Sequence, residues 1–381
     1  MTLEEQRKKI DAIDDQLVEL FQARMDVAAN IAKIKMEQNL PVYHAGRERE
    51  KLADVADKSR DEMKEYTRVL YTQLFELSRT YQDKLMQTES PQYDEITRAI
   101  DNTPKVFPKS AMVACQGVEG AYSQIACEKL FRKPQIMYFQ NFEGVFSAIE
   151  QGLCKYGILP IENSTAGSVK RVYDLMIRHR FHIVRSVRIK IDHNLLANRG
   201  ATLSGIREIF SHEQAINQSS AFLKSLGSNV KVTAVENTAV AAEMVAKSGR
   251  TDVAALSSRN CAELYNLNCL ASSVQDTGNN HTRFICISKE LEIYPGADKT
   301  TLMLVLPHRP GALYKILARL YTLDINLLKL ESRPIPDRDF EFMFYLDVET
   351  SVYSEDFAQM ICDLHSICEE CKYLGSYTEV V

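Results

Sequence analysis

The ten residues 160–169 place one carboxylate, one amide and three hydroxyls between two apolar runs. Residues 156–159 before them have the apolar character of a buried strand, and residues 169–176 after them predict a helix whose first turn Ser168 could cap. Ligands of open α/β sheets bind at the carboxyl ends of strands, where helix N-termini also present N–H groups to anions. We therefore expect a small, anionic ligand at these residues. A polar turn without a ligand is the alternative.

Cationic side chains recur on a helix expected at the start of the chain. Arg24 and Lys35 lie eleven residues apart, about 20° beyond three full turns, so both project from one face. Arg7 lies on another face, about 100° away. On a later helix, Ser78 and Gln82 form a polar notch one turn apart in an apolar stripe. These residues suit a site shared between long helices, and an ordinary solvated coiled-coil surface is the alternative.

The segment that carries these residues is helical by its periodicity. Residues 3–87 contain a single proline and a single glycine, Pro41 and Gly46, which bracket the first turn. A first helix reaching about Gln38 would be roughly 50 Å long, too long to bury its apolar stripe without partners. A bundle or a dimer is therefore expected. The predicted helices cover residues 3–38, 47–58 and 61–86.

The domain boundaries follow from changes in composition and hydrophobic pattern along the chain. Residues 1–90 form the helical domain, and the prolines within residues 91–110 predict a polar linker. Residues 111–290 alternate short apolar runs with helical ones, which indicates an α/β domain. Residues 183–196 are extended and long enough to cross between two lobes, so we expect a cleft. The strands expected here are 112–115, 136–139, 156–161, 208–211, 230–235, 252–256 and 284–288.

The C-terminal segment, residues 299–378, has the element order βαββαβ of the ferredoxin-like fold. Many functions share this fold, so the order alone assigns none. The expected strands are 302–306, 325–332, 341–348 and 373–378, and the expected helices are 312–323 and 354–371. The fold class is thus multidomain: all-α, then two-lobed α/β of the periplasmic-binding-protein kind, then α+β ferredoxin-like.

Composition excludes several classes of protein. A chain of 381 residues suggests two or three domains. A formal net charge of −5 argues against nucleic acid as the main partner. The N-terminus lacks the apolar core of a signal peptide, and no stretch approaches the ~20 apolar residues of a membrane span. Nine cysteines, mostly within apolar runs, are typical of reduced core residues, so we expect a cytoplasmic protein.

A cluster near the C-terminus has metal-ligand chemistry, because Cys362, His365, Cys368 and Cys371 recur every three residues. On a helix, steps of three drift by roughly 60° each, so the outer two cysteines point to opposite sides. The buried stripe of an amphipathic helix explains the pattern better than a metal does. That stripe would comprise Phe357, Ile361, Leu364, Cys368 and Cys371.

The helical segment resembles the helical chorismate mutases over nearly its whole length, in both order and spacing. The matching residues are Arg7, Arg24, Lys35, the stretch 46–50, Ser78 and Gln82. The resemblance implies an intertwined dimer with Arg24, Lys35, Arg47, Glu48, Ser78 and Gln82 in one pocket and Arg7 from the partner chain. By this analogy Arg7 and Arg24 bind the carboxylates of chorismate, Lys35 and Gln82 donate to its ether oxygen, and Glu48 holds its hydroxyl. A pericyclic rearrangement needs no nucleophile, so the catalyst fixes the compact conformer and stabilises charge on the breaking C–O bond.

The central segment resembles the prephenate dehydratases through four motifs in the correct order, residues 117–123, 160–169, 211–218 and 282–284. The resemblance implies that Thr282 is the central catalytic hydroxyl, that Arg283 anchors a carboxylate and that Phe284 is a packing wall. Thr282 would donate a hydrogen bond to the leaving oxygen, and Glu162 is a competing proton source. The polar lining would be completed by Ser123, Asn163, Ser164, Ser211 and Gln218.

The last segment resembles the ACT regulatory domain of these dehydratases. Its two signature stretches are Gly311-Ala312-Leu313 and Glu331-Ser332-Arg333-Pro334. The resemblance implies allosteric binding of phenylalanine at a domain interface. Gly311 would allow close backbone approach, and a free helix N-terminus suits an amino-acid carboxylate. A dimerising module that binds nothing is the alternative.

These patterns predict a bifunctional chorismate mutase and prephenate dehydratase of phenylalanine biosynthesis, inhibited by phenylalanine. We expect a cytoplasmic homodimer or higher oligomer that acts on chorismate and prephenate without a cofactor or a metal. One alternative is a dehydratase whose helical segment only dimerises. The other is a non-enzymatic amino-acid sensor.

Overall fold

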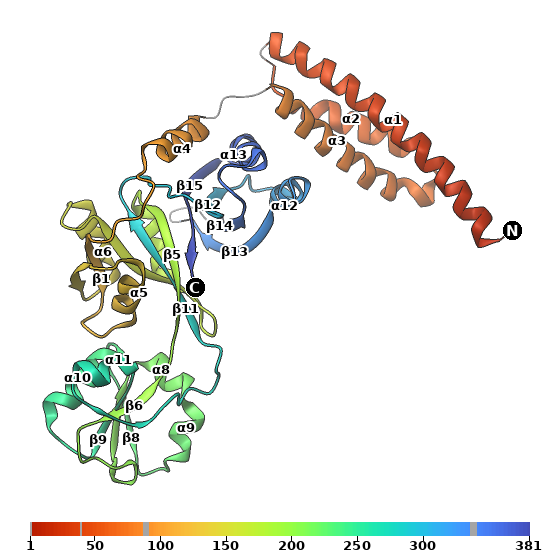
Figure 1. Cartoon of the computed structure of the whole chain (residues 1–381). Coiled ribbons are helices and arrows are strands. Elements are labelled where there is room, and N and C mark those ends of the chain that lie inside the picture. The colour runs from red at the N-terminus through yellow and green to blue at the C-terminus, as the bar shows by residue number, and fades with distance from the viewer. Residues whose placement is uncertain (1, 39, 87–90, 336–340) are drawn as a thin grey trace. The chain divides into compact units, whose positions relative to one another are not determined.

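The structure, a computed structural model, describes residues 2–38, 40–86, 91–335 and 341–381. These residues form two compact units, whose elements Figure 1 labels. No helix in this part of the chain combines the length and apolarity that crossing a membrane requires. The first unit comprises residues 1–94, 311–323 and 355–368, and the second comprises residues 95–310, 324–354 and 369–381.

Three helices at the N-terminus confirm the predicted all-α segment. They are α1 (Leu3–Glu37), α2 (Ala45–Asp57) and α3 (Lys64–Met86), with one 3-10 turn, Asp61–Met63, before α3. Thr2 and Glu5 begin α1 with a reciprocal capping box, each side chain accepting from the other's backbone N–H. The first unit also contains α12 (Ala312–Thr322) and α13 (Glu355–Ile367), which pack against each other.

The segment of residues 91–110, predicted to be a polar linker, is mostly helical. Helix α4 (Pro91–Asn102) begins at a proline, whose fixed φ suits the first helical position. Ile96 and Ala99, one turn apart, are buried. After α4, Thr103 accepts a hydrogen bond from the backbone N–H of Ile293 at 2.9 Å, which ties this helix end to the loop after β11. The prolines therefore mark a helix start and the loop after the helix.

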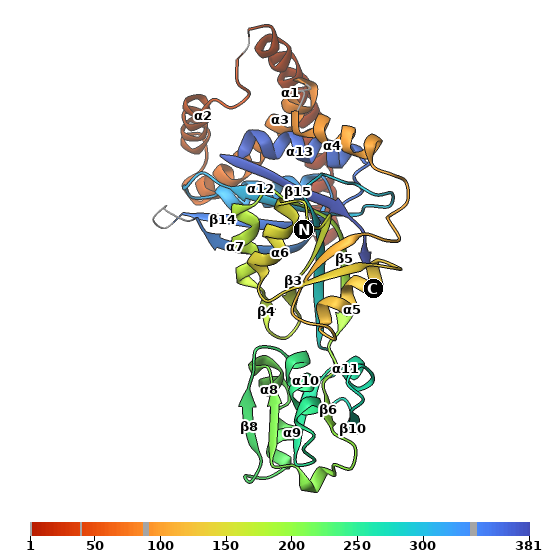
Figure 2. The same ribbon diagram turned by 90° about the vertical axis from the view of Figure 1, so that its left-hand side faces the viewer.

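The first lobe of the second unit is built on a mixed sheet in the order β16-β5-β11-β3-β1-β2, with β4 paired to β3. Helices α6 and α7 cover one face of this sheet, and α5 covers the other (Figure 2). The strands β3 and β11 are antiparallel neighbours although they are far apart in sequence. The elements are β1 (Met112–Gln116), α5 (Tyr122–Leu130), β2 (Gln135–Phe139), α6 (Phe142–Glu150), β3 (Tyr156–Asn163), β4 (Gly167–Ser168), α7 (Lys170–Arg178), β5 (His182–Lys190), β11 (His281–Ser288) and β16 (Glu379–Val380).

A second mixed sheet, in the order β10-β6-β9-β7-β8, forms the second lobe. The chain enters this lobe after β5 and returns before β11, so the predicted extended crossing at residues 183–196 is confirmed (Figure 1). The elements are β6 (Asn194–Ala197), a 3-10 turn (Leu203–Gly205), β7 (Glu208–Ser211), α8 (Glu213–Gln218), α9 (Ser220–Ser225), β8 (Lys231–Ala234), α10 (Thr238–Ser248), β9 (Val253–Ser257), α11 (Arg259–Leu264) and β10 (Asn268–Ala271).

The third sheet, which we call the C-terminal sheet, is antiparallel in the order β13-β14-β12-β15, as the ferredoxin-like prediction requires. Its strands are β12 (Lys299–Val305), β13 (Asn326–Pro334), β14 (Phe342–Glu349) and β15 (Glu370–Tyr377). Met303, Tyr345 and Leu374 share one hydrophobic core with Tyr173 and Met176 of α7. The C-terminal sheet and the first lobe are therefore packed as one body.

Two local predictions were wrong. Helix α13 ends at Ile367, and Cys371 lies in strand β15, so the expected helical stripe to Cys371 does not exist. Ser168 does not cap α7, because it lies in β4 and donates to Glu331 Oε2 at 2.7 Å. Within the described residues, no group of three histidine, cysteine or acidic side chains is arranged to hold a metal ion.

Candidate active sites

Helices α1 and α3 bring four of the predicted mutase residues together. Arg24 donates to the Ser78 hydroxyl and, at 3.1 Å, to the backbone carbonyl of Leu74. One helical turn along α3, Gln82 Oε1 accepts from Lys35 Nζ at 3.2 Å. Ser78 and Gln82 are both buried, which is unusual for polar side chains on a surface helix. The polar notch and the two cations thus face each other between the helices.

Burial changes the electrostatics of these two cations. Desolvation lowers the pKa of Lys35, and the nearby carboxylates of Asp83 and Glu48 oppose that effect. Desolvation also lowers the pKa of Arg24, which lies over the ring of Phe75 at 5.8 Å. A partly desolvated cation binds an anion more strongly than one in water does, because charge interactions are screened less there.

The remaining predicted mutase residues lie differently. Glu48 pairs with Arg79, which also pairs with Glu76. Arg79 was missed by the sequence reasoning, although its position next to Ser78 was a usable signal. Arg47 pairs with Glu50 at 2.9 Å and is exposed, and Arg7 is exposed on α1. The structure therefore does not bring Arg7 or Arg47 to Arg24 and Lys35.

A β-bulge in β3 sets the side-chain positions of the predicted dehydratase residues. Arg283 of β11 pairs with Glu162, but the next residue, Phe284, pairs with Pro160, so Ile161 is an extra residue in β3. Bulges re-aim side chains and are common beside active sites. Here the bulge turns Asn163 to the same face of the sheet as its partner Thr282.

Asn163 and Thr282 are the centre of a buried hydrogen-bond network. Asn163 Nδ2 donates to Thr282 Oγ1 at 2.9 Å and to Asn280 Oδ1 at 2.8 Å. Asn163 Oδ1 accepts from the hydroxyl of Thr165 at 2.7 Å and from two backbone N–H groups. Because the Thr282 oxygen accepts from Asn163, its own hydrogen can be donated elsewhere.

The network continues into the second lobe through Gln218 at the end of α8. Gln218 Nε2 donates to Thr165 Oγ1 at 2.7 Å, and its Oε1 accepts from Asn280 at 2.9 Å. His193 Nε2 lies 3.0 Å from the same Gln218 oxygen. Burial lowers the pKa of His193, which keeps the ring neutral. His193 was missed by the sequence reasoning because it stands outside the four motifs.

A hollow of about 380 Å³ opens beside this network. Thr165 and Gln218 line it together with the start of α8, where His212 caps the helix by accepting from the Gln214 N–H at 3.3 Å. Its volume lies in the range of small-molecule sites. The ligand predicted for these residues is anionic. Because the lining carries one acidic side chain, that of Glu213, such a ligand would be bound by backbone groups and neutral polar side chains.

Three predicted hydroxyls have other partners. Ser123 donates to the carbonyl of Gln116 at 2.5 Å, and Ser211 donates to the carbonyl of Leu256 at 2.8 Å. Ser164 donates to the carbonyl of Asn279 and accepts from the N–H of His281, both at 2.9 Å. These serines hold the loops around the site, and the structure does not bring Ser123 or Ser211 into the Asn163–Thr282 network.

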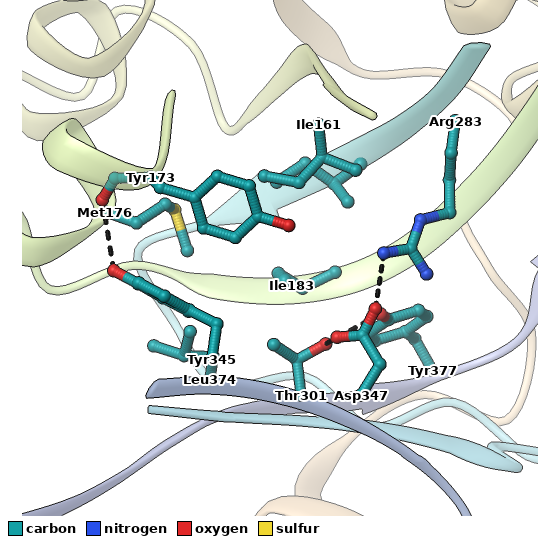
Figure 3. Close-up of a pocket in the computed structure, with 11 residues that line it drawn as sticks. Ile161, Tyr173, Met176, Ile183, Arg283, Thr301, Tyr345, Asp347, Leu374 and Tyr377 are labelled. Atoms are coloured by element: carbon teal, nitrogen blue, oxygen red, sulfur yellow. Dashed lines mark hydrogen bonds and ion pairs between the residues drawn. The ribbon is translucent and has the colours of Figure 1, made fainter. Parts of the chain in front are cut away.

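Glu162 and Arg283 lie on the opposite face of β3 and β11 from Thr282, which corrects their predicted roles. Arg283 pairs with Asp347 of the C-terminal sheet, and Glu162 pairs with Lys329 at 3.1 Å (Figure 3 shows the Arg283 side). The cavity that Arg283 lines is about 10 Å³, room for roughly one water molecule. Arg283 therefore cannot anchor a substrate carboxylate there, nor can Glu162 reach the face of Thr282. Phe284 is buried in the core on the Thr282 side of β11.

The two predicted regulatory stretches lie at a helix start and on a strand. Gly311 has φ +81° just before Ala312 and Leu313 begin α12. On β13, Glu331 accepts from Ser168 and Arg333 pairs with Asp174 at 2.6 Å. Ser332 and Pro334 alternate with these residues and are exposed.

Comparison with known proteins identifies both parts of the chain. Residues 6–83 match the family model described as chorismate mutase type II, and residues 113–292 match that of prephenate dehydratase. The bifunctional chorismate mutase/prephenate dehydratase of Escherichia coli (strain K12) is 30% identical over 97% of this chain and 95% of its own length. The chain belongs to this bifunctional family. It is therefore an enzyme with chorismate mutase and prephenate dehydratase activities.

Other relatives of this bifunctional enzyme are named as dehydratases. Arogenate dehydratase/prephenate dehydratase 2 of Arabidopsis thaliana is 35% identical over 79% of the chain and 80% of its own length. Arogenate dehydratase 2 of Petunia hybrida is 38% identical over 70% of the chain and 71% of its own length.

Two solved structures share its fold. Prephenate dehydratase from Arthrobacter aurescens, in complex with L-Phe, has a TM-score of 0.64 and 27% identity, covering 70% of this chain and 90% of its own. GqqA, described as a novel type of quorum-quenching acylase, has a TM-score of 0.64 and 32% identity, covering 70% of this chain and 97% of its own.

Proposed function

We propose that chorismate rearranges in the pocket that Arg24, Lys35, Ser78 and Gln82 form between α1 and α3. The observation that carries this assignment is the contact of Lys35 with Gln82, at 3.2 Å. Both groups can donate to one ether oxygen, and a fixed positive charge stabilises the negative charge that develops on it in the transition state. Arg24 binds a substrate carboxylate, and Arg7 of a second copy binds the other.

The test of the mutase site is Lys35→Met in the full chain. We expect the mutase kcat to fall by about a hundredfold or more, while the dehydratase rate is unchanged. Lys33→Met, at an exposed lysine on the same helix, serves as the matched control. A Lys35→Met enzyme with a normal mutase rate would contradict the assignment.

The proposed dehydratase site is the Asn163–Thr282 pair and the hollow beside it. Loss of the ring hydroxyl needs a hydrogen-bond donor at the leaving oxygen, and aromatisation drives release of carbon dioxide. Thr282 is supported as that donor because its oxygen accepts from Asn163 at 2.9 Å, which leaves its hydrogen for the substrate. Glu162 lies on the opposite face of the sheet from Thr282, so it cannot supply this proton directly.

Three variants test this site. Thr282→Val should lower the dehydratase kcat by about a hundredfold or more, because it removes the donor. Thr282→Ser keeps the hydroxyl and should retain more activity, and Asn163→Ala should fall between them. The mutase rate of each variant serves as an internal control for folding. Full turnover by Thr282→Val would exclude the assignment.

Phenylalanine is proposed as the effector, at the residues of α12 and β13 that resemble the regulatory signatures. This proposal is supported by the Arthrobacter aurescens relative, whose structure is a complex with L-Phe. Dehydratase turnover should fall with added L-phenylalanine and not with D-phenylalanine. Equal rates with both enantiomers at millimolar concentration would exclude feedback.

We also infer a cytoplasmic homo-oligomer. The buried cysteines, Cys115, Cys127, Cys154, Cys261 and Cys286, support a reducing compartment. An enzyme that is found in the secreted fraction of fractionated cells would contradict this location.

Arogenate is a second candidate substrate for the dehydratase. The relatives from Petunia hybrida and Arabidopsis thaliana that carry arogenate in their names are 34% to 38% identical to this chain. Arogenate differs from prephenate by an amino group in place of a keto group. Comparing kcat/KM for the two substrates decides between them, and a ratio above ten for prephenate would reject arogenate.

A further inference from the structure

The C-terminal sheet meets the back of the dehydratase site through two facing pairs of charged residues. Lys329 of β13 and Asp347 of β14 are cross-strand neighbours in that sheet. Glu162 of β3 and Arg283 of β11 are cross-strand neighbours in the first lobe. We call these four side chains the charge quartet. Two of its members are one residue away from Asn163 and Thr282.

Contacts within the charge quartet alternate in sign. Arg283 pairs with Asp347, and the same Arg283 nitrogen lies 3.6 Å from Glu162 Oε2. Glu162 Oε1 in turn lies 3.1 Å from Lys329 Nζ. The side chains of Arg283 and Lys329 are each only 12% exposed, and that of Asp347 is 7% exposed. The side chain of Glu162 is 37% exposed, and the two carboxylates and two cations give the charge quartet no net charge.

Hydroxyl groups of the C-terminal sheet fix the position of Asp347. Thr301 of β12 donates to Asp347 Oδ1 at 2.7 Å, and the hydroxyl of Tyr377 lies 2.8 Å from the Thr301 hydroxyl (Figure 3). Burial by itself would lower the pKa of Arg283, but the charge of Asp347 raises it above its usual range. The guanidinium of Arg283 therefore stays charged, and the C-terminal sheet sets the position of its partner Asp347.

We propose that Lys329 and Asp347 are positioning residues of the dehydratase site. They act through Glu162 and Arg283, and they hold β3 and β11 so that Asn163 and Thr282 stay aligned on the opposite face. This proposal rests on the assignment of Thr282 and Asn163 as the dehydratase site. A misplacement of about 1 Å from a distant change can cost a hundredfold in rate, so such a support affects catalysis without touching substrate.

The same contacts connect β13, which carries the second predicted regulatory stretch, with the proposed dehydratase site. Lys329, Glu331 and Arg333 point to the first lobe, where Lys329 Nζ also donates to Ser168 Oγ at 2.9 Å. Ser332, between two of them, is exposed on the other face of β13. A ligand that shifts β13 therefore moves the partner of Glu162.

A buried ion pair contributes more to fixing geometry than to net stability, because desolvation offsets much of its attraction. This difference separates positioning from simple stabilisation. Replacing a buried pair by apolar residues of similar size is often neutral or stabilising. The double variant Arg283→Met with Asp347→Leu should therefore fold normally and still lose the alignment.

The experiment uses the full chain and measures dehydratase kcat, KM for prephenate, mutase rate and melting temperature. Lys329→Met and the double variant should each lower the dehydratase kcat by between about ten and a hundredfold. The KM and the mutase rate of both variants should stay close to those of the parent, and the double variant, which removes a whole ion pair, should also keep the parent's melting temperature. Lys329→Arg, which keeps the charge, should restore most of the rate.

Glu379→Gln is the matched control. Glu379 is 3% exposed and joins Lys299 of the same C-terminal sheet to Arg188 of β5, at 2.8 and 2.7 Å. It contacts neither β3 nor β11 through these bonds, so this variant should keep its kcat. Parent-like kcat in Lys329→Met and the double variant would overturn the proposal, as would an equal loss in Glu379→Gln. Failure of the dehydratase site itself shows separately, as full turnover by Thr282→Val.

Discussion

Thr282 and Arg283 are neighbours in sequence, yet their side chains serve opposite faces of one sheet. Successive residues of a strand point to opposite sides, so only one of the two can face the cleft. Thr282 accepts a hydrogen bond from Asn163 on one face, and the ion pair with Asp347 joins Arg283 to the C-terminal sheet on the other. The motif of residues 282–284 is thus divided between the two faces of the sheet.

His193 gives a prediction at the same scale. Its Nδ1 is buried without a hydrogen-bond partner among the described residues, so protonation would bury an unpaired charge. Its folded-state pKa lies below the unfolded value of about 6.5. The unfolded chain then binds more protons in acid, so the stability from neutral His193 is present above about pH 6.5 and is lost as the pH falls below it.

Thermal unfolding at pH 7.5 and pH 5.5 measures this effect. Between pH 7.5 and pH 5.5, the melting temperature of the parent enzyme should fall further than that of the His193→Gln variant, because glutamine does not titrate. The difference between the two proteins isolates His193 from other titrating groups. Equal losses would show that His193 does not control acid stability.

At the scale of the elements, the bulge in β3 determines which of its side chains shares a face with Thr282. Regular alternation from the buried Leu159 would turn Glu162 toward Thr282, and the extra residue Ile161 turns Asn163 there instead. Pro160 is the local signal, because proline within a strand is found at bulges or edges. Reading this proline as a bulge would have placed Glu162 correctly.

Strand β15 gives the prediction at this scale. Gly375 has φ +139°, and a Cβ built there would lie 2.2 Å from the carbonyl oxygen of Ile183 on β5. Gly375→Ala should therefore force β15 away from β5 and cost roughly 2 kcal/mol or more in the free energy of unfolding. Urea unfolding of the full chain measures this cost.

Gly152→Ala is the control for Gly375→Ala. Gly152 also has a positive φ, +74°, but a Cβ there would meet nothing within 4 Å. Its cost should be limited to the backbone strain of about 1 kcal/mol. Similar costs for the two variants would show that the close approach of β15 and β5 does not matter.

At the scale of the whole molecule, helix α1 leaves an apolar face exposed. Ile10 is 57% exposed, Leu17 is 54% exposed and Leu20 is 68% exposed, although they form the periodic stripe expected to be buried. A helix of 35 residues with such a stripe requires a partner. A second copy of the chain would cover the stripe and bring its own Arg7.

Leu20→Glu tests this dimer, because a charge in a buried stripe opposes association. We expect a smaller particle by light scattering, or a weaker association constant, together with loss of mutase activity. The dehydratase should remain active, since its network lies within one chain. Leu3→Glu, at the exposed helix start, is the control, and an unchanged mutase rate in Leu20→Glu would rule out a shared site.

The sequence by itself determined the helical segment, the two lobes and the C-terminal sheet. Local periodicity and turn residues carry that information, as the match of α1, β7 and α12 to their predicted ranges shows. The same local rules failed at α4, where prolines suggested a linker, and at Cys371, where a helical stripe ran on into a strand.

Only the tertiary structure decided which side chains share a face. The pairing of β3 with β11 joins residues more than a hundred positions apart, and the bulge sets their register. Likewise, the contacts of Glu162 and Arg283 with Lys329 and Asp347 depend on packing between sheets. Local patterns do not encode the packing between sheets, and for the register they offer one signal here, Pro160. The signal does not name the partner strand, and a shift of one residue leaves composition unchanged and reverses every side chain.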